Sequence, residues 1–191
     1  TRGTVVSAGS LVGTTASLQG AITNNAAVTF NQSTVGTYSG AMSGSGSLSK
    51  TGIGRLSLSG SSSYNGATTV SAGELNLSGG SIANSAVTVA SGASLSGYGS
   101  VGTIGGAGAI NPGNSPGILT TPQVNPSGGT TFNFEMTGTA PTYNNASNSV
   151  NDLIQITGGT PFSQALAAGN GVFIYFSGAA LFTGSTAVQY Q

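Results

Sequence analysis

One pentapeptide of this chain has the spacing of a serine nucleophile. Gly113-Asn114-Ser115-Pro116-Gly117 fits the pattern G-x-S-x-G, in which a sharp turn presents a serine hydroxyl for attack on a carbonyl. A serine needs a neighbouring base for that reaction, most often histidine. The chain contains no histidine, and Lys50 is a poor substitute. We therefore interpret the segment as a double turn, because Pro112-Gly113 and Pro116-Gly117 are both turn dipeptides.

Two carboxylates form a candidate acid–base pair. Glycoside hydrolysis uses two carboxyl groups about 5–9.5 Å apart. Glu135 and Asp152 are close enough in sequence to lie on neighbouring turns of a repeating fold, whereas Glu74 lies about three turns away. Glu135 stands between Phe134 and Met136 and is expected to point outward, as is Asp152. We predict solvated charges, or for Asp152 a cap on turn amides, rather than catalysis.

Glycines and cations offer the remaining candidate chemistry. The run Gly105-Gly106-Ala107-Gly108 is similar to phosphate loops and to calcium-binding nonapeptides, but it lacks the lysine of the former and the aspartate of the latter. Glycines at the corners of a repeating fold explain it better. Lys50 and Arg55 offer charges to an anionic glycan, although a structural role at a corner is favoured for Lys50. The chain also contains no cysteine. We therefore predict that it has no catalytic, cofactor-binding or metal-binding residue and is not an enzyme.

The charge content is far below that of an ordinary soluble domain. Three basic and three acidic residues give a formal net charge of zero, and charged residues make up 3% of the chain, against about 25% in typical domains. The sequence therefore lacks the basic surface that binds nucleic acid or an anionic membrane, and little repulsion opposes association between copies. The longest apolar run, 171–176, is too short to span a bilayer and predicts a buried strand.

The elements that must position these residues are short strands. From 44 to 60, every even position carries Gly, Leu or Lys, and every odd position carries Ser, Thr, Ile or Arg. A period of two indicates an extended strand, because successive side chains point to opposite faces. No stretch has the 3.6-residue apolar period of a helix, and the hydrophobic content of 37% at regular spacing favours order over disorder.

The strands recur at a regular interval of about 20 residues, which lies in the range of stacked-repeat folds. Leu56-Ser57-Leu58 returns as Leu75-Asn76-Leu77, and Leu95 follows Leu75 at nearly the same interval. Three short strands with tight turns account for such a period. The sequence therefore predicts an all-β fold, a parallel β-helix (β-solenoid) with three strands per turn and about nine turns in all.

A second series of glycines repeats near the C-terminus. Gly138, Gly158 and Gly178 are equally spaced along the chain, and each follows an apolar strand, which predicts further stacked turns. Six of the seven phenylalanines lie at or beyond position 132. We predict regular turns over 1–120 and a more aromatic cap over 121–191, with a boundary near 120–129 where Pro122 and Pro126 are expected to interrupt strand pairing.

Three segments, taken in order, resemble a known family. The first pattern consists of Gly44, Gly46, Leu48, Lys50, Gly52, Gly54, Leu56, Leu58 and Gly60, followed by Gly73, Leu75 and Leu77. It resembles the autotransporter-associated β-strand repeat of bacterial type V secreted passengers and covers about 44–77. Residues 111–119, with Pro112, Gly113, Pro116 and Gly117, resemble a glycine-rich segment near the C-terminal end of such passengers. Residues 151–158 resemble the strand that follows it.

The resemblance carries its own expectations. It implies a right-handed β-helix that is exported across the outer membrane, is displayed or released outside the cell, and belongs to the C-terminal part of a passenger, which helps to nucleate folding during secretion. It also implies a translocator β-barrel downstream in the gene.

Three functions follow as hypotheses. The first is a non-catalytic stalk with an adhesion or self-association surface, whose partners are other copies, neighbouring cell surfaces or glycans. The second is a subunit of an extracellular fibre or surface layer formed by end-to-end stacking, since a β-helix ends in open strand edges. The third, less favoured, is a glycan-binding or glycan-degrading β-helix. Loss of a detected activity in Glu135→Gln and Asp152→Asn would favour the third.

Overall fold

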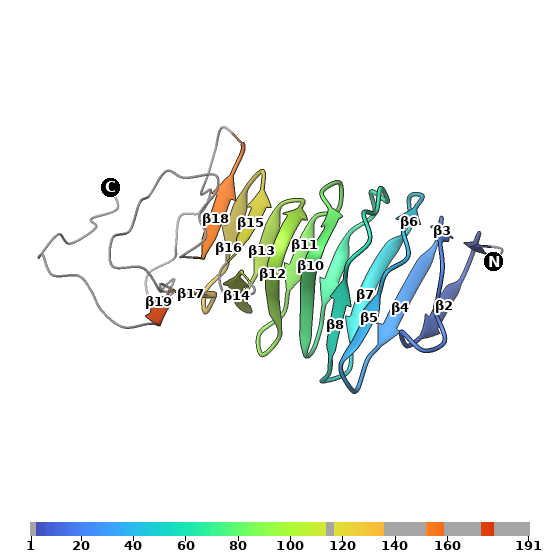
Figure 1. The fold of residues 1–191 in the computed structure, drawn as a ribbon, viewed down its shortest axis with the longest axis horizontal. Helices are drawn as coiled ribbons and strands as arrows, with labels where there is room; N and C mark the ends of the chain where they lie inside the picture. The colour runs from blue at the N-terminus through green and yellow to red at the C-terminus, as the bar shows by residue number, and fades with distance from the viewer. Residues whose placement is uncertain (1–2, 114–116, 136–151, 159–172, 178–191) are drawn as a thin grey trace, which may run out of the picture.

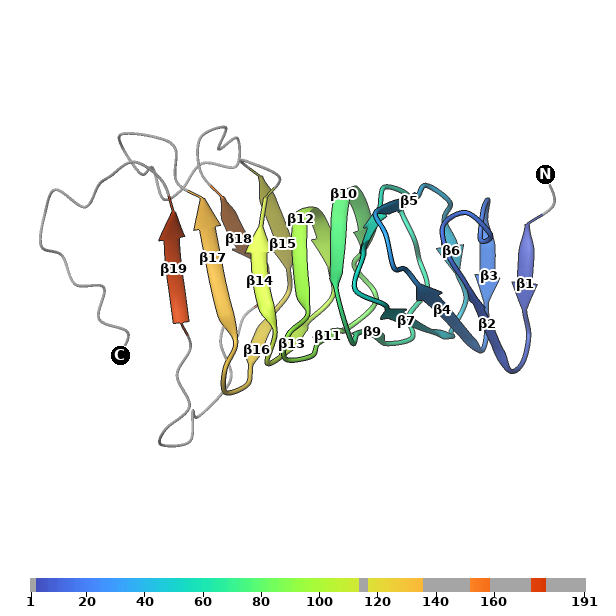
Figure 2. The ribbon, with the colours of Figure 1, turned by 90° about the horizontal axis from the view of Figure 1, so that it is seen from below.

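The chain forms an elongated stack of short parallel strands. The computed structural model describes residues 3–113, 117–135, 152–158 and 173–177. Within them the fold is an all-β solenoid of about six turns, with most paired strands about 20 residues apart and no helix. Figures 1 and 2 show the strands side by side along one long axis, from β1 near one end to β19 at the other. The predicted solenoid is confirmed, whereas the predicted total of about nine turns includes residues outside the described ranges and stays a prediction.

One face of the stack starts as a three-stranded parallel sheet. Its strands lie in the order β1 (Thr4–Val6), β3 (Ile22–Asn24) and β6 (Met42–Ser43). Thr4 is in register with Ile22, and Ile22 with Met42. Each of these two intervals corresponds to one turn of the solenoid.

The second face is a seven-stranded parallel sheet that runs along the described stack. One residue of each strand is in register with the next, giving the inward stack Leu11, Val28, Leu48, Thr68, Val87, Ile104 and Val124. The strands are β2 (Ser10–Gly13), β4 (Ala27–Asn31), β7 (Ser47–Thr51), β9 (Thr68–Val70), β11 (Val87–Val89), β13 (Ile104–Gly106) and β16 (Val124–Pro126).

The third face belongs to a nine-stranded sheet. Seven strands form its main path: β5 (Gly36–Tyr38), β8 (Arg55–Leu58), β10 (Glu74–Ile82), β12 (Ser94–Val101), β14 (Ala109–Pro112), β17 (Thr131–Glu135) and β19 (Phe173–Ser177). Leu56, Leu75 and Leu95 are in register, so the leucine repeat found in the sequence is a physical stack. Each of the three is fully buried.

Two long strands connect the third face with the first. β10 bends at a register shift between Ser78 and Ser81, after which Ser81 pairs with Ser100 of β12. The remaining two strands of the nine-stranded sheet are β15 (Ile118–Thr121) and β18 (Leu153–Ile156). β15 pairs with the end of β12 and β18 pairs with β15, so both continue the first face. The solenoid therefore keeps three faces, although three sheets of unequal size describe them.

The alternating run at 44–60 turns a corner instead of forming one long strand. β7 ends at Thr51 and β8 begins at Arg55, with Gly52, Ile53 and Gly54 between them. The even positions Leu48, Lys50, Leu56 and Leu58 are buried on both sides of the corner, and Ile53 is exposed at its tip. The alternation thus correctly identifies the inward positions, while the paired glycines mark the bend.

The strands before Gly138, Gly158 and Gly178 do not stack on one another in sequence order, contrary to the prediction from their equal spacing. β18 pairs with β15 and not with β17 or β19, whereas β17 pairs directly with β19. Strands one after another in sequence visit different faces, so equal spacing alone does not place them in one stack. Gly158 donates its amide to the Pro122 carbonyl at 2.9 Å, and Gly138 and Gly178 lie outside the described residues.

Pro122 and Pro126 do not interrupt the pairing of strands. Pro126 is the last residue of β16 and is in register with Gly106 of β13. The Ser127 amide donates to the Gly106 carbonyl at 3.0 Å, so the bond to the preceding turn does not need an N–H on the proline. Pro122 lies in the corner between β15 and β16, where no ladder bond is lost.

Candidate functional site

The corner after β7 holds a buried cation. Lys50 is 0% exposed and is in register between Phe30 and Val70 on the inward side of the second face. Its Nζ donates to the carbonyl oxygens of Thr51 at 2.9 Å, Gly52 at 2.7 Å and Ala72 at 3.1 Å. An ammonium group excluded from water needs such partners, and these three acceptors use all of its N–H donors.

Glycines shape the backbone around this lysine. Gly52 and Gly73 have φ angles of 75° and 65°, in the left-handed region that glycine adopts without strain. A Cβ on Gly73 would lie 2.5 Å from the Gly54 oxygen and 2.6 Å from the Gly52 oxygen. Only a residue without a side chain fits where one turn passes over the carbonyls of the turn before it.

The other predicted motif residues share this arrangement. The leucines among them, which are Leu48, Leu56, Leu58, Leu75 and Leu77, are buried in the core. The glycines lie at corners, where an added Cβ would collide with backbone oxygens of the preceding turn, at Gly44, Gly46, Gly54 and Gly60. The motif therefore specifies core positions and close corners.

A polar row runs across three turns outside the third face. It comprises Arg55, Glu74, Asn76, Ser78 and Ser96, from β8, β10 and β12. Arg55 Nε donates to Glu74 Oε2 at 2.8 Å, Ser96 Oγ donates to Glu74 Oε1, and Asn76 Nδ2 donates to Ser96 Oγ at 2.8 Å. Ser78 Oγ donates to Asn76 Oδ1 at 2.8 Å.

The polar row joins strands and shows no reactive group. Both carboxylate oxygens of Glu74 already accept hydrogen bonds, and Ser96 and Asn76 are buried against neighbouring turns. The Arg55 side chain is 44% exposed, so its ion pair adds only about 0–1 kcal/mol. Burial lowers the pKa of Lys50, and the negative charge of nearby Glu74 partly restores it.

The predicted cap by Asp152 is confirmed. Asp152 Oδ1 accepts a hydrogen bond from the Gly117 amide at 3.1 Å. Gly113 has a φ of 91°, and a Cβ there would collide with the same oxygen. The carboxylate therefore occupies the space of a missing side chain and binds the end of the 113–117 turn, so the second and third family-like segments meet.

Several candidate groups lie outside the described part of the molecule. These are Ser115, Pro116 and the Glu135 side chain, so neither the serine pattern nor the Glu135–Asp152 pair is tested. Gly105 and Gly106 lie in β13 and not at a corner, whereas Gly108 lies in the corner between β13 and β14, where a Cβ would collide with the Ala90 oxygen. The corner interpretation of the run 105–108 is therefore right only for its end. Among the described residues no group of three or more Asp, Glu, His or Cys side chains gathers in a way that suits a metal ion. No helix long and apolar enough to cross a membrane occurs there either.

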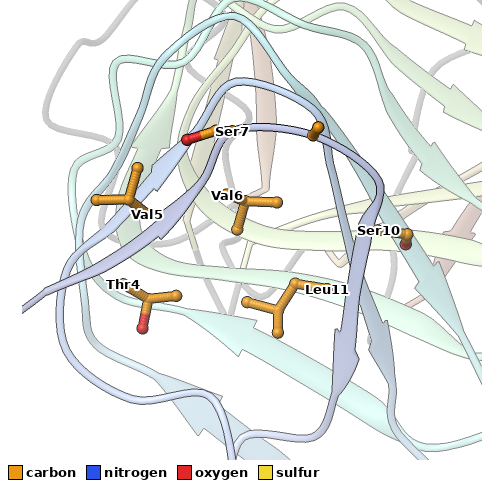
Figure 3. A pocket seen from close by; sticks show the side chains of 7 residues that line it. Thr4, Val5, Val6, Ser7, Ser10 and Leu11 are labelled. Carbon is orange, nitrogen blue, oxygen red and sulfur yellow. The ribbon is translucent and has the colours of Figure 1, made fainter.

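The N-terminal end of the stack contains a shallow hollow. Its volume is about 240 Å³, and the lining residues are Thr4, Val5, Val6, Ser7, Ala8, Ser10 and Leu11. Figure 3 shows Val6 and Leu11 inside the curve of the first turn. β1 and β2 are edge strands of their sheets, and Val5 is 65% exposed. The hydrophobic core is therefore only partly covered at this end of the stack.

The alternating pattern did not identify a buried chain of hydroxyl groups. Tyr64 Oη and Thr68 Oγ1 lie 2.6 Å apart, and Thr68 Oγ1 and Ser85 Oγ 2.7 Å apart. Ser85 Oγ donates to the Gly66 oxygen at 2.7 Å. The available signal was Thr68 itself, a polar residue at an inward position of the second face.

Raising the pH from 10 to about 12 is expected to destabilise the fold through Tyr38. Burial raises the pKa of Tyr38 from 10.0 to about 12, and its hydroxyl donates to the Gly20 oxygen at 2.7 Å. The folded state keeps this proton more tightly than the unfolded state, so its contribution is complete below pH 10 and is lost as pH passes 12. The loss is about 2–3 kcal/mol. Burial raises the pKa of Tyr64 in the same direction, whereas the lowered pKa of Lys50 has the opposite effect.

Urea unfolding between pH 9 and 12 measures this effect. Tyr38→Phe is expected to flatten the dependence on pH, since it removes the proton in question. An equal dependence in both proteins would contradict the assignment to Tyr38.

Comparison with known proteins identifies the region around Lys50. Residues 48–77 match the family model described as passenger-associated-transport-repeat. No curated protein and no solved structure gives a significant match. The matched residues run from Leu48 of β7 to Leu77 of β10 and include Lys50, its three acceptors, Arg55 and Glu74. The match of residues 48–77 to this repeat and the β-solenoid fold together fit an autotransporter passenger with repeats.

Proposed function

We propose that this chain is a non-catalytic segment of a secreted or surface-displayed passenger, acting as a stalk with an adhesion or self-association surface. One observation carries the proposal: the matched repeat at 48–77 forms part of a continuous solenoid. A long stack of this kind projects a surface away from its anchor without needing a catalytic pocket. The repeat family and the fold are both consistent with a structural passenger.

The chemistry of the described surface supports contact through hydroxyl and methyl groups. Lys50 is buried, Arg55 and Glu74 pair with each other, and Asp152 binds a turn amide. On the outside of the second face, four residues are in register, at the roughly 4.8 Å separation of paired strands: Thr29, Ser49, Thr69 and Thr88. Such a face attracts partners by contact area and hydrogen bonds more than by charge.

Bead assays test the surface role directly. Beads coated with the folded chain are expected to cluster or to adhere to cultured cells, with little change between about 50 and 500 mM salt. The matched control replaces Thr29, Ser49, Thr69 and Thr88 by lysine, which adds repulsion on the second face, with circular dichroism to verify the fold. Beads of the parent chain that neither cluster nor adhere would contradict the proposal.

The N-terminal end favours a second candidate, a fibre built by end-to-end stacking. β1 and β2 present edge strands next to the hollow lined by Val6 and Leu11, and such edges pair with further strands. Electron microscopy of the purified chain is expected to show filaments, which Val6→Lys at that end should shorten. Short uniform particles at every concentration would contradict the fibre.

A further inference from the structure

The acceptors of Lys50 come from two successive turns of the solenoid. Thr51 ends β7 and Gly52 follows it, whereas Ala72 lies one turn later, between β9 and β10. Nζ is 2.7–3.1 Å from all three oxygens, and the residue is fully buried. One side chain therefore binds carbonyl oxygens at the corners of two successive turns.

Opening either corner separates the ammonium from its partners. If the later turn lifts away, the ammonium loses the Ala72 oxygen while Phe30 still lies in register with Lys50 on its other side. If the earlier turn opens, Lys50 moves away together with Thr51 and Gly52, and the same cross-turn bond to the Ala72 oxygen is broken. A buried charge with unsatisfied donors is strongly unfavourable, so either opening favours the other.

Without such a link, the turns of a stacked-repeat protein tend to open one at a time. In a quasi-one-dimensional fold each turn contacts only the turns beside it, and local opening proceeds turn by turn. We infer that the Lys50 ammonium fuses the turn of β7 and β8 with the turn of β9 and β10 into one unit that opens cooperatively. This unit coincides with the matched repeat, because 48–77 holds the lysine and all three acceptors.

The chain offers a selective probe, because Lys50 is its single lysine. The intact protein is treated with an amine-acetylating reagent in increasing, sub-denaturing urea, and acetylation of each amine is followed by mass spectrometry. Ser47→Lys supplies an exposed amine in the same strand as an internal control. Lys50 is expected to react at least about a thousandfold more slowly than that amine, with the urea dependence of global or whole-unit unfolding. A Lys50 rate that does not change with urea indicates local opening of one corner and overturns the inference.

A variant provides the second measurement. Hydrogen exchange of the parent is expected to give one common urea dependence for the amides of β7, β8, β9 and β10. In Lys50→Met, which keeps much of the side-chain volume, these amides are expected to separate into two groups, one for each turn. Arg55→Met, which removes the neighbouring exposed cation, should leave the common dependence intact. A common dependence in Lys50→Met, or a split in Arg55→Met as well, would overturn the role of the ammonium.

Discussion

Leu75→Ala is expected to lower the free energy of unfolding by about 2–5 kcal/mol, the range for a fully buried leucine. Leu75 is 0% exposed and lies in register between Leu56 and Leu95, so the cavity opens inside a continuous stack. Neighbouring turns are held by strand pairing on three faces and cannot easily close the gap. The value comes from urea unfolding monitored by circular dichroism.

Val12→Ala is the control for this substitution. Val12 is 61% exposed on the outside of β2, and its truncation is expected to change stability by no more than about 0.5 kcal/mol. Equal effects at the two positions would contradict an interior built on stacked leucines.

Gly73→Ala is expected to destabilise the fold by about 2–5 kcal/mol through two effects, backbone strain and steric collision. Substitution of a second glycine distinguishes the two effects. The positive φ of 65° strains any residue with a Cβ, by about 1–2 kcal/mol. In addition, the new Cβ would lie 2.5–2.7 Å from backbone atoms of Gly52, Ile53 and Gly54, and forcing them apart adds about 1–3 kcal/mol.

Gly92→Ala isolates the first effect. Gly92 has a similar φ of 82°, but nothing lies within 4 Å of the position of its Cβ. It should therefore show the backbone strain alone. If the two variants have the same midpoint of urea unfolding, close packing at the repeat corner is not what requires glycine at 73.

The period-two alternation and the leucine repeat predicted the fold and the register of the leucine stack. Leu56, Leu75 and Leu95 recur at intervals of one turn, and a shift of one residue in the pairing would move these leucines from the core to the solvent face. The alternation around Lys50 likewise identified inward positions, although the bend at Gly52–Gly54 could be located only from the strands themselves.

Other features depend on contacts that spacing does not encode. A solenoid turn visits three faces, so the equal spacing of Gly138, Gly158 and Gly178 could not show that β18 belongs to a different face from β17. The three oxygens around Lys50 are backbone atoms, which any sequence possesses. The polar row likewise depends on the side-chain directions of Glu74, Asn76 and Ser96 across separate turns.

The direction of the hydrogen bonds has a mechanical consequence. Hydrogen bonds between successive strands point along the stack, so a force that pulls its two ends apart acts in line with these bonds. Such a force detaches the turns one after another, starting from an end. Each regular turn of about 20 residues would release roughly 65 Å of extended chain. A tether of this kind would lengthen in repeated steps under load, absorbing sudden tension instead of passing it all to whatever the chain holds.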